Sequence, residues 1–286
     1  MKLPNFLVVG AARSGTTYLH HLMIQHPEIF LPDKKALFFF NDKECVSQIA
    51  LDEYQKEFIN AGTAKAIGEI SPTYMYFKWI PDQIFSFLGD IRLIFLLRNP
   101  IERAYSHYLV HVSLGNEFLS FYEAIIAEEE RLKTSNFRIK GRYSYIDRGY
   151  YHHQIKRFLP LFQKEKMLFI ISEEFYDDPL STFNQVCKFL GISNYEPNLK
   201  VDKFHFSIPC PLKPYLTSQF IRRRLLNVKG GWRLSRTIKS ILKNYPKSSK
   251  YPPISLKARE YLERVFREDI KLTSDFLGKD ISKLWF

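Results

Sequence analysis

Cysteine is scarce in this chain, whose 286 residues include only Cys45, Cys187 and Cys210. Three is an odd number, and the spacing does not follow the paired Cys or Cys/His patterns of zinc sites. The sequence therefore argues against a disulfide framework and predicts reduced thiols and no metal site. Reduced thiols are typical of a cytoplasmic enzyme, and a cytoplasmic location is the expectation here.

Long apolar runs are also absent. No run approaches the ~18 residues that a membrane-spanning helix needs, and the chain passes from Met1–Pro4 straight into an apolar segment, too early for a signal peptide. A hydrophobic content of 45% with 16% aromatic residues argues against disorder. Because no linker, repeat or low-complexity tract interrupts the sequence, one domain is expected over residues 1–286.

The net charge of +12 predicts attraction to anionic partners. Much of the charge lies between Lys200 and Lys257, but neither a zinc finger nor an RNP-type aromatic signature is present. Nucleic acid is therefore not expected as the partner. Three interpretations of the basic stretch 222–243 are open: it forms a solvated surface, contacts an acidic acceptor, or makes a peripheral contact with a membrane.

Apolar runs alternate with helical patterns along the chain. Strands are expected at Phe6–Val9, Ala64–Ile70, Ile91–Leu97 and Lys166–Ser172, and helices at Thr16–His26, Pro81–Leu88, Pro100–Ser113, Glu117–Lys133, Tyr151–Phe162, Leu180–Leu190 and Leu256–Leu277. This alternation predicts the α/β class, with a central, mostly parallel sheet flanked by helices on both faces.

The segment Gly10–Thr17 has the glycine spacing of a phosphate-binding loop without its lysine. A nucleotide triphosphatase reads G-x-x-x-x-G-K-[ST], whereas position 16 here is Thr and the only cation in the loop is Arg13. Backbone N–H groups at the start of a helix, glycines and an arginine fork all favour an oxyanion. The loop is thus expected to bind an anionic group other than a magnesium triphosphate, an ordinary tight turn being the alternative.

A second cation leaves the sheet at Arg98, directly after the apolar strand 91–97. Ligands of parallel α/β sheets bind at the carboxyl ends of the strands, so Arg98 and the loop should meet there. Ser106 lies about two turns inside the following helix and is a candidate for the same ligand. Pairing of Arg98 with a nearby acid such as Glu102 is an equally weighted alternative.

Three segments in this order, VVGAARSGTT, IRLIFLLRNPIERAYSHY and the tail from YPPISLKAREYLERVF to the end, resemble sulfotransferases that use 3′-phosphoadenosine 5′-phosphosulfate (PAPS). The resemblance is to the bacterial and heparan-sulfate-type branch and spans almost the whole chain. It implies a P-loop-like phosphosulfate loop and transfer of a sulfuryl group from PAPS to a hydroxyl of a carbohydrate, lipid or secondary metabolite. The product nucleotide is 3′-phosphoadenosine 5′-phosphate (PAP). A non-catalytic or impaired PAPS- or glycan-binding member is the alternative, and a P-loop kinase a weaker one.

The resemblance also implies roles for individual residues. Arg13 stands where the family usually has a lysine that contacts the phosphosulfate and its leaving oxygen, and Arg98 and Ser106 match the pair that binds the 3′-phosphate. The 5′-phosphate would be held by Ser14, Gly15, Thr16 and Thr17. The family has a basic loop that closes over the nucleotide, and Lys247 and Lys250 are the candidate cations of that loop here. The segment Lys229–Gly231 is an alternative candidate for the same loop.

The chain departs from the family where the general base should be. In the segment 34–40, Ala36 and Phe38 take the places of the family's Glu and His. Glu69 is the predicted catalytic substitute, and a structural carboxylate paired with Arg98 or Arg103 is the alternative. Three histidines are further candidates for the base: His20, His21 and His107.

Overall fold

The computed structural model describes residues 2–43, 48–200, 208–209, 247–248 and 252–286. The chain divides into two compact units. The first comprises Met1–Ala104, Ile146–Phe204 and Leu262–Phe286, and the second Tyr105–Tyr145 and His205–Tyr261. The expectation of one domain over residues 1–286 stays a prediction.

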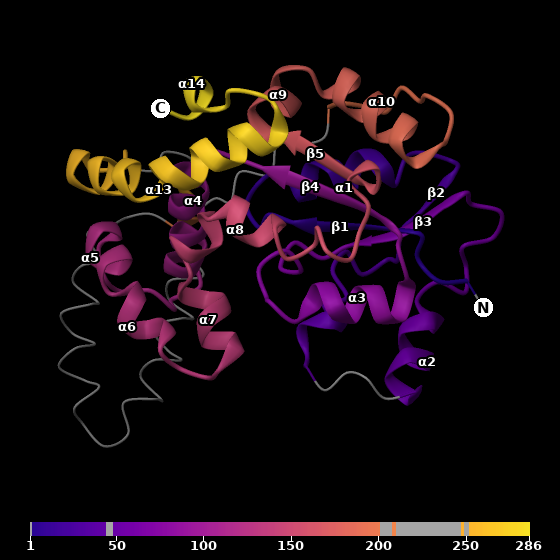
Figure 1. Cartoon of the computed structure of the whole chain (residues 1–286), viewed down its shortest axis with the longest axis horizontal. Coiled ribbons are helices and arrows are strands. Elements are labelled where there is room, and N and C mark those ends of the chain that lie inside the picture. The colour runs from indigo at the N-terminus through magenta and orange to yellow at the C-terminus, as the bar shows by residue number, and fades with distance from the viewer. Residues whose placement is uncertain (1, 44–47, 201–207, 210–246, 249–251) are drawn as a thin grey trace. The chain divides into compact units, whose positions relative to one another are not determined.

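A five-stranded sheet forms the centre of the first unit (Figure 1). Its strands are β1 (Phe6–Gly10), β2 (Ile29–Phe30), β3 (Ala66–Ile70), β4 (Arg92–Leu97) and β5 (Met167–Ile171), in the order β2-β3-β1-β4-β5. Every pair is parallel, which confirms the predicted class. β1 is buried along its whole length and β4 over all but its first residue, because helices cover both faces, and this explains their uninterrupted apolar sequence.

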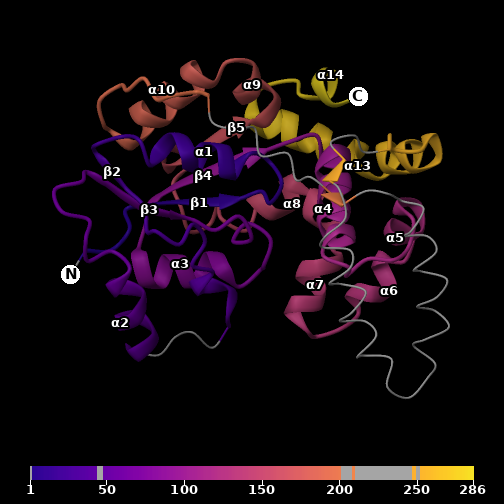
Figure 2. The same cartoon turned by 180° about the vertical axis from the view of Figure 1, so that it is seen from behind.

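Helices pack on both faces of this sheet (Figures 1 and 2). On one face lie α1 (Thr16–Met23), α9 (Ser172–Asp177) and α10 (Pro179–Leu190), and on the other α2 (Gln48–Lys56) and α3 (Ile80–Leu88). The first face is closed by side chains with no solvent exposure, such as Val8 and Phe183. All strands run the same way, so the ends of β1, β3, β4 and β5 lie at one edge of the sheet.

The first unit also contains short helices and parts of two long ones. The long helices are α4 (Pro100–Ser113) and α13 (Leu256–Leu277), and the short elements are α8 (Tyr151–Ile155), α14 (Ser282–Trp285) and the 3₁₀ turns Phe39–Asn41, Asp147–Gly149 and Lys164–Lys166. The predicted helix ends at Leu190 and Leu277 are confirmed, and the glycines that follow them, Gly191 and Gly278, have left-handed φ values of 73° and 66°. Among the described helices, none is both long and apolar enough to cross a membrane.

The predicted helix at 16–26 ends three residues early, at Met23, and two other predicted helices differ more from the structure. The segment 117–133 forms α5 (Phe121–Ile126) and α6 (Glu128–Leu132), because Ser120 and Glu123 form a reciprocal capping box that starts the helix at Phe121. The helix expected at 151–162 ends at Ile155. Pro160 explains the early end, since its ring lacks an N–H and would clash with the carbonyl of Lys156 in a continued helix.

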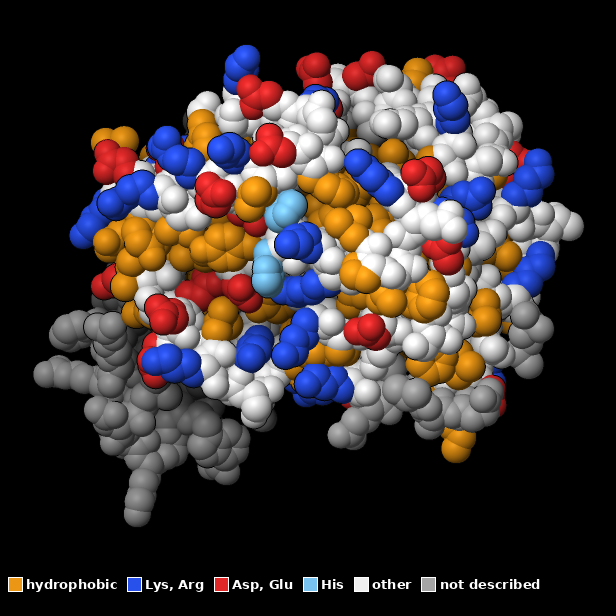
Figure 3. Space-filling view, in the orientation of Figure 1, with side chains coloured by type: hydrophobic (Ala, Val, Ile, Leu, Met, Phe, Trp, Pro, Cys, Tyr) orange, Lys and Arg blue, Asp and Glu red, His pale blue; other side chains and the backbone are white. Residues whose placement is uncertain are grey.

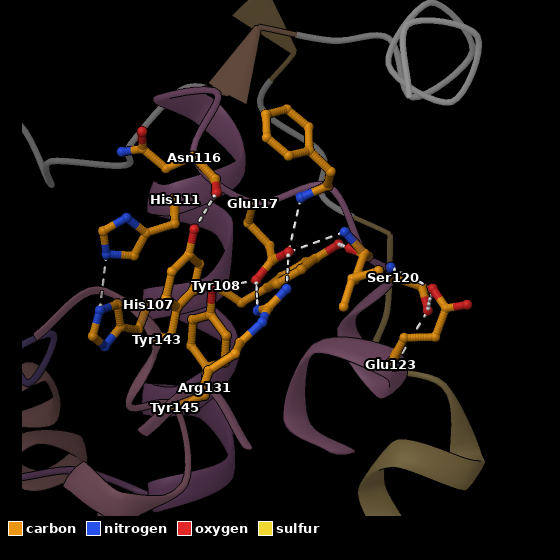
Figure 4. A network of polar contacts seen from close by, with 12 residues as sticks. His107, Tyr108, His111, Asn116, Glu117, Ser120, Glu123, Arg131, Tyr143 and Tyr145 are labelled. Atoms are coloured by element: carbon orange, nitrogen blue, oxygen red, sulfur yellow. Dashed lines mark hydrogen bonds and ion pairs between the residues drawn. The ribbon is translucent and has the colours of Figure 1, made fainter. Parts of the chain in front are cut away.

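The second unit is built around a buried carboxylate (Figure 4). It contains the later part of α4, α5, α6, α7 (Phe137–Tyr143) and the antiparallel pair β6 (Ile208–Pro209) and β7 (Lys247–Ser248). Glu117, with 1% of its side chain exposed, accepts from Arg131 Nη1 at 2.5 Å and from the Tyr145 hydroxyl at 2.8 Å. Burial raises the pKa of Glu117, but the hydrogen bonds from Arg131, Leu119 and Tyr145 outweigh it and lower the pKa.

Charged side chains of both signs share the face shown in Figure 3, where Lys and Arg are interspersed with Asp and Glu. The basic stretch 222–243, for which a membrane or acceptor contact is predicted, lies outside the described residues. Of the three cysteines, Cys187 is a buried free thiol, as predicted, whereas Cys45 and Cys210 lie outside the described residues.

Candidate anion-binding site

The loop from Gly10 to Thr17 joins the end of β1 to the start of α1, as predicted. Gly15 is the N-cap of α1, and no side chain caps this helix end. The N–H groups of the first turn therefore have no intrahelical acceptor and are available to an anion. Glycine is required at position 15 because its φ is 90° and an added Cβ would lie 3.1 Å from the Tyr176 hydroxyl.

Ser14 is held from the neighbouring strand end. Its carbonyl oxygen accepts a hydrogen bond from Ser172 Oγ at 2.7 Å, and Ser172 directly follows β5. The Ser14 side chain is buried beside the Tyr151 hydroxyl, and its Oγ has no hydrogen bond of good geometry among the described residues. A buried hydroxyl whose hydrogen bonding is incomplete can be satisfied by a ligand, so Ser14 is suited to the anion site.

Arg98 reaches this loop from the end of β4. Its Nη1 donates to the carbonyl oxygen of Arg13 at 3.2 Å, and its own carbonyl oxygen accepts from the Tyr151 hydroxyl at 2.8 Å. Arg98 is half-buried and forms no ion pair with a carboxylate in the described part of the chain, so the pairing with Glu102 is absent. A half-buried guanidinium without a counter-charge is suited to an anionic ligand.

The turn that holds Arg98 in place is built by Asn99. Its Oδ1 accepts from the N–H of Ile101 at 2.9 Å and so caps the start of α4, while its Nδ2 donates to the Trp285 carbonyl at 2.6 Å. Its backbone N–H donates to Glu173 Oε1 at 2.8 Å. These bonds explain why Asn follows Arg98 in the sequence: its side chain fixes the direction in which the chain leaves the sheet.

Lys35 is a third cation at the loop, and the sequence reasoning missed it. Its Nζ donates to Thr17 Oγ1 at 2.5 Å, and no carboxylate pairs with it in the described ranges. Burial and the nearby Arg13 lower the pKa of Lys35 to about 8. The sequence signal for it is the pair Lys34–Lys35, which directly precedes the positions 36 and 38 where the family's Glu and His are replaced.

Two tyrosines also line the loop and were missed. The rings of Tyr18 and Tyr176 stack with centroids 5.8 Å apart. Burial raises the pKa of Tyr176, while the positive charges of Arg98 and Arg13 act in the opposite direction, which places this hydroxyl beside both cations. A phenol in this position can donate a hydrogen bond to the anion that the loop would hold.

Glu69, the predicted general base, lies in β3 and has no exposed surface. Its neighbours are the hydroxyls of Ser71, Tyr54 and Tyr74, and neither Arg98 nor Arg103 pairs with it. Burial raises the pKa of this carboxyl, and the three hydroxyls offset part of that effect. Neither carboxyl oxygen has a hydrogen bond of good geometry among the described residues. The catalytic role of Glu69 stays a prediction. In this conformation its carboxyl group is enclosed and has no access to an acceptor.

The histidines differ in their surroundings. His20 lies in α1, and burial together with the charges of Lys35 and His21 lowers its pKa to about 4, so the ring is uncharged at neutral pH. Its Nε2 is buried without a hydrogen-bond partner in the described part of the chain. His107 belongs to the second unit, where its Nε2 lies 3.0 Å from that of His111.

The other predicted site residues belong to the second unit or lie outside the described residues. Ser106 lies in the part of α4 that belongs to the second unit. Lys247 is in β7, where its backbone pairs with Pro209, and its side chain lies outside the described residues. Lys250 and the alternative segment 229–231 lie outside them entirely. Their roles stay predictions.

A separate hollow lies along β5, lined by Phe169, Phe276 and Lys164 among others. It shares no residue with the Gly10–Thr17 loop or with Arg98. The candidate site therefore depends on the convergence of the loop and its cations, because strand ends and open helix N-termini locate a phosphate site in this fold better than concavity does.

The comparison with protein families agrees with this geometry. The family model described as "Sulfotransferase domain" matches residues 3–208, which include the loop, Lys35 and Arg98. The chain belongs to the sulfotransferase domain family. This is a family of PAPS-dependent transferases, so the resemblance drawn from the sequence is confirmed.

Similar proteins come from both animals and bacteria. The chain is 27% identical over 281 residues to the mouse bifunctional heparan sulfate N-deacetylase/N-sulfotransferase 4, covering 93% of the chain and 29% of that relative. It therefore spans less than a third of that protein's length. A crystal structure of a sulfotransferase from Alicyclobacillus acidocaldarius matches with a TM-score of 0.74 and 25% identity, covering 99% of both chains.

A further solved structure, a mouse sulfotransferase complexed with PAP, matches with a TM-score of 0.52 and 14% identity, covering 93% of this chain and 84% of that one. At this identity the likeness shows the sulfotransferase fold alone. That structural neighbour binds PAP, the nucleotide that sulfuryl transfer leaves behind.

Proposed function

We propose that this chain is a sulfotransferase that moves a sulfuryl group from PAPS to a hydroxyl of a carbohydrate, lipid or secondary metabolite. The observation that carries the proposal is the convergence of Arg13, Lys35 and Arg98 on an uncapped helix N-terminus. Lys35 and Arg98 have no carboxylate partner among the described residues, so an anionic ligand would supply the missing counter-charge.

The residues present suit the two charged ends of PAPS. The N–H groups after Gly15, the buried Ser14 hydroxyl and Thr17 would hold the 5′-phosphosulfate. Arg98 would bind the 3′-phosphate together with Ser106, as the family resemblance implies. The 3′-phosphate distinguishes PAPS from ATP, whose γ-phosphate would need the lysine that Thr16 replaces.

Sulfuryl transfer requires positioning and charge stabilisation more than covalent chemistry. The bond between sulfur and the phosphate oxygen breaks, a bond from sulfur to the acceptor oxygen forms, and negative charge develops on the phosphate oxygen. Cations fixed beside that oxygen stabilise the charge without reorganising during the reaction. The loop residues orient the donor so that the acceptor can attack in line.

The relatives favour a glycan among the acceptors. One is named for heparan sulfate N-sulfation and another, from mouse, is the heparan sulfate glucosamine 3-O-sulfotransferase 5, 24% identical over 193 residues. The aromatic segment Phe39–Phe40 with Tyr54 and Tyr74 lies beside the loop segment that carries Lys35. Nucleic acid is not proposed as a partner.

The donor assignment is tested by thermal unfolding with added nucleotides. PAP should raise the melting temperature by several degrees at concentrations far above its Kd, and ATP with magnesium should raise it much less. Adenosine 5′-phosphate, which lacks the 3′-phosphate, is the matched control. Equal stabilisation by PAP and ATP, or by neither, would contradict the assignment.

Catalysis is tested separately by transfer of labelled sulfate from PAPS to a panel of glycans, lipids and phenols. A product that requires both PAPS and the acceptor supports the enzyme. A non-catalytic PAPS- or glycan-binding member is the second candidate, favoured by Ala36 at the family's Glu position and by the enclosure of Glu69. Binding of PAP without transfer to any acceptor would support that candidate.

A further inference from the structure

The Gly10–Thr17 loop lacks a lysine, but a lysine side chain is nevertheless present at it. Lys35 enters from the segment between β2 and the Phe39–Asn41 turn, and its Nζ lies 2.5 Å from Thr17 Oγ1. Thr17 is the second residue of α1, in the turn whose N–H groups have no intrahelical acceptor. The ammonium group thus lies at the position where the loop would hold a phosphate.

Two features distinguish Lys35 from an ordinary surface lysine. It is half-buried, whereas its neighbour Lys34 is exposed. It also has no ion pair with a carboxylate in the described part of the chain, and the charged group beside it is Arg13, a second cation. A half-buried ammonium that lies beside another cation is destabilised, and an anionic ligand next to Lys35 would offset that cost.

We propose that Lys35 donates a proton to the oxygen from which the sulfuryl group departs. This inference rests on the proposed function. As the bond from sulfur to the 5′-phosphate oxygen breaks, its electron pair stays on that oxygen, and the ammonium of Lys35 transfers a proton to it and becomes an amine. The acceptor hydroxyl loses its proton to solvent as its oxygen bonds to sulfur, and the amine takes a proton back after PAP leaves.

Arg13 cannot take this role, because a guanidinium is not deprotonated in proteins. A general acid works best when its pKa is near the operating pH. Burial and Arg13 bring the pKa of Lys35 down to about 8, from the 10.5 of an unperturbed lysine. The remaining titratable neighbour, His20, is uncharged at neutral pH because its pKa is lowered to about 4, so it does not compete as an acid.

Three substitutions at two positions separate the chemical role from simple charge. Lys35→Arg keeps the positive charge but cannot release a proton, and Lys35→Met removes both. PAP release from PAPS, with and without acceptor, should lose kcat by ~10²-fold or more in both variants, with KM for PAPS changed less in Lys35→Arg. Lys34→Met, at the exposed neighbour, is the matched control and should keep wild-type kinetics.

A rescue variant makes the test sharper. If Lys35 supplies the proton that a loop lysine would supply, the double variant Arg13→Lys/Lys35→Met should have a kcat at least tenfold higher than Lys35→Met alone. The new amine can then deliver the proton from the loop itself. Wild-type kcat in Lys35→Arg would overturn the inference, since charge alone would then suffice. Absence of rescue with correctly folded protein, judged by circular dichroism, would also count against it.

Binding of PAP gives a readout that does not need turnover. An anion beside Lys35 raises its pKa, so binding takes up a proton at alkaline pH, and PAP affinity should fall by up to about tenfold between pH 7 and pH 9. The slope should vanish in Lys35→Met and persist in Lys34→Met, as measured by calorimetry.

The outcomes distinguish this inference from the proposed function. If wild-type protein does not bind PAP, the proposed function fails and the inference with it. If it binds PAP with a pH slope that Lys35→Met leaves unchanged, only the inference fails. If PAP binds but PAPS is never converted to PAP with any acceptor, the chain is a binding protein and Lys35 is no proton donor.

Discussion

The guanidinium of Arg98 hydrogen-bonds the backbone of Arg13, with 3.2 Å between Nη1 and the carbonyl oxygen, although 85 residues separate them in the chain. The bond joins the end of β4 to the loop after β1, two strands that are neighbours in the sheet. Arg13 itself has a left-handed φ of 76°, an uncommon conformation for a residue other than glycine. One cation thus both supports the loop and remains available to a ligand.

The first prediction concerns this arginine. Arg98→Ala should abolish the preference for PAP over adenosine 5′-phosphate, because a charge-assisted hydrogen bond to the 3′-phosphate is lost. The affinity for PAP should fall by about 10- to 100-fold, and the affinity for adenosine 5′-phosphate should change little. Isothermal calorimetry with both nucleotides measures this. Lys78→Ala, at an exposed lysine in the same unit, is a control. A preference that survives in Arg98→Ala would assign the 3′-phosphate to other residues.

The second prediction concerns the start of α1. Gly15→Ala should lower PAP affinity at least tenfold, because a φ of 90° and an added Cβ 3.1 Å from the Tyr176 hydroxyl would displace the loop. Gly62→Ala is a matched control, since its φ is also positive, at 48°, and an added Cβ would meet nothing closer than 3.9 Å. Both variants should lose about 1 kcal/mol of stability from backbone strain. Equal PAP affinity in the two would contradict the loop assignment.

The third prediction uses the enclosed carboxyl of Glu69. Because its pKa is raised in the folded state, the folded protein binds this proton more tightly than the unfolded chain, and the stability so gained is lost as pH rises from about 4.5 through the folded pKa. Glu69→Gln, which cannot ionise, should therefore raise the melting temperature at pH 7 by about 2–4 °C and have little effect at pH 4.

Unfolding curves of Glu69→Gln at the two pH values, beside those of Glu196→Gln at an exposed position, measure this effect. The same variant tests the predicted catalytic role. Loss of transfer activity with unchanged PAP binding would support Glu69 as the general base, and retained activity would remove it from the mechanism.

The fourth prediction concerns the carboxylate in the second unit. Arg131→Met should destabilise the protein by about 3–5 kcal/mol, since it leaves the buried charge of Glu117 without its partner. The double variant with Glu117→Gln should recover part of the loss, because no buried charge then remains. Urea unfolding followed by fluorescence compares the variants with wild type. An unchanged midpoint in Arg131→Met would show that the ion pair contributes nothing to stability.

The fifth prediction concerns the stability of the protein at acid pH, which depends on the same carboxylate. The pKa of Glu117 is lowered in the folded state, so its contribution to stability is present above the unfolded value of 4.5 and is lost as pH falls through the folded pKa. Wild-type protein should therefore lose more stability between pH 5 and pH 3 than Glu117→Gln does.

Local features were predictable from the sequence. The apolar runs at 6–9 and 91–97 led to the strands because both are buried on two faces, and the glycines of the loop led to the strand-to-helix turn because spacing and backbone conformation act within a few residues. The helix at 117–133 was wrong because the Ser120 capping box competes with the longer helical pattern, and the buried position of Glu117 is invisible in periodicity.

The sequence by itself determined the parallel α/β architecture, the strand-to-helix loop at Gly10–Thr17 and the family, since each depends on short segments whose residues act on their own neighbours. Only the tertiary structure decided which side chains meet at the loop. Lys35 reaches Thr17 across 18 residues, and Tyr54 from α2 lies beside Glu69 of β3. Such contacts depend on how the chain returns to the sheet edge, because packing of the whole sheet and its helices sets that path.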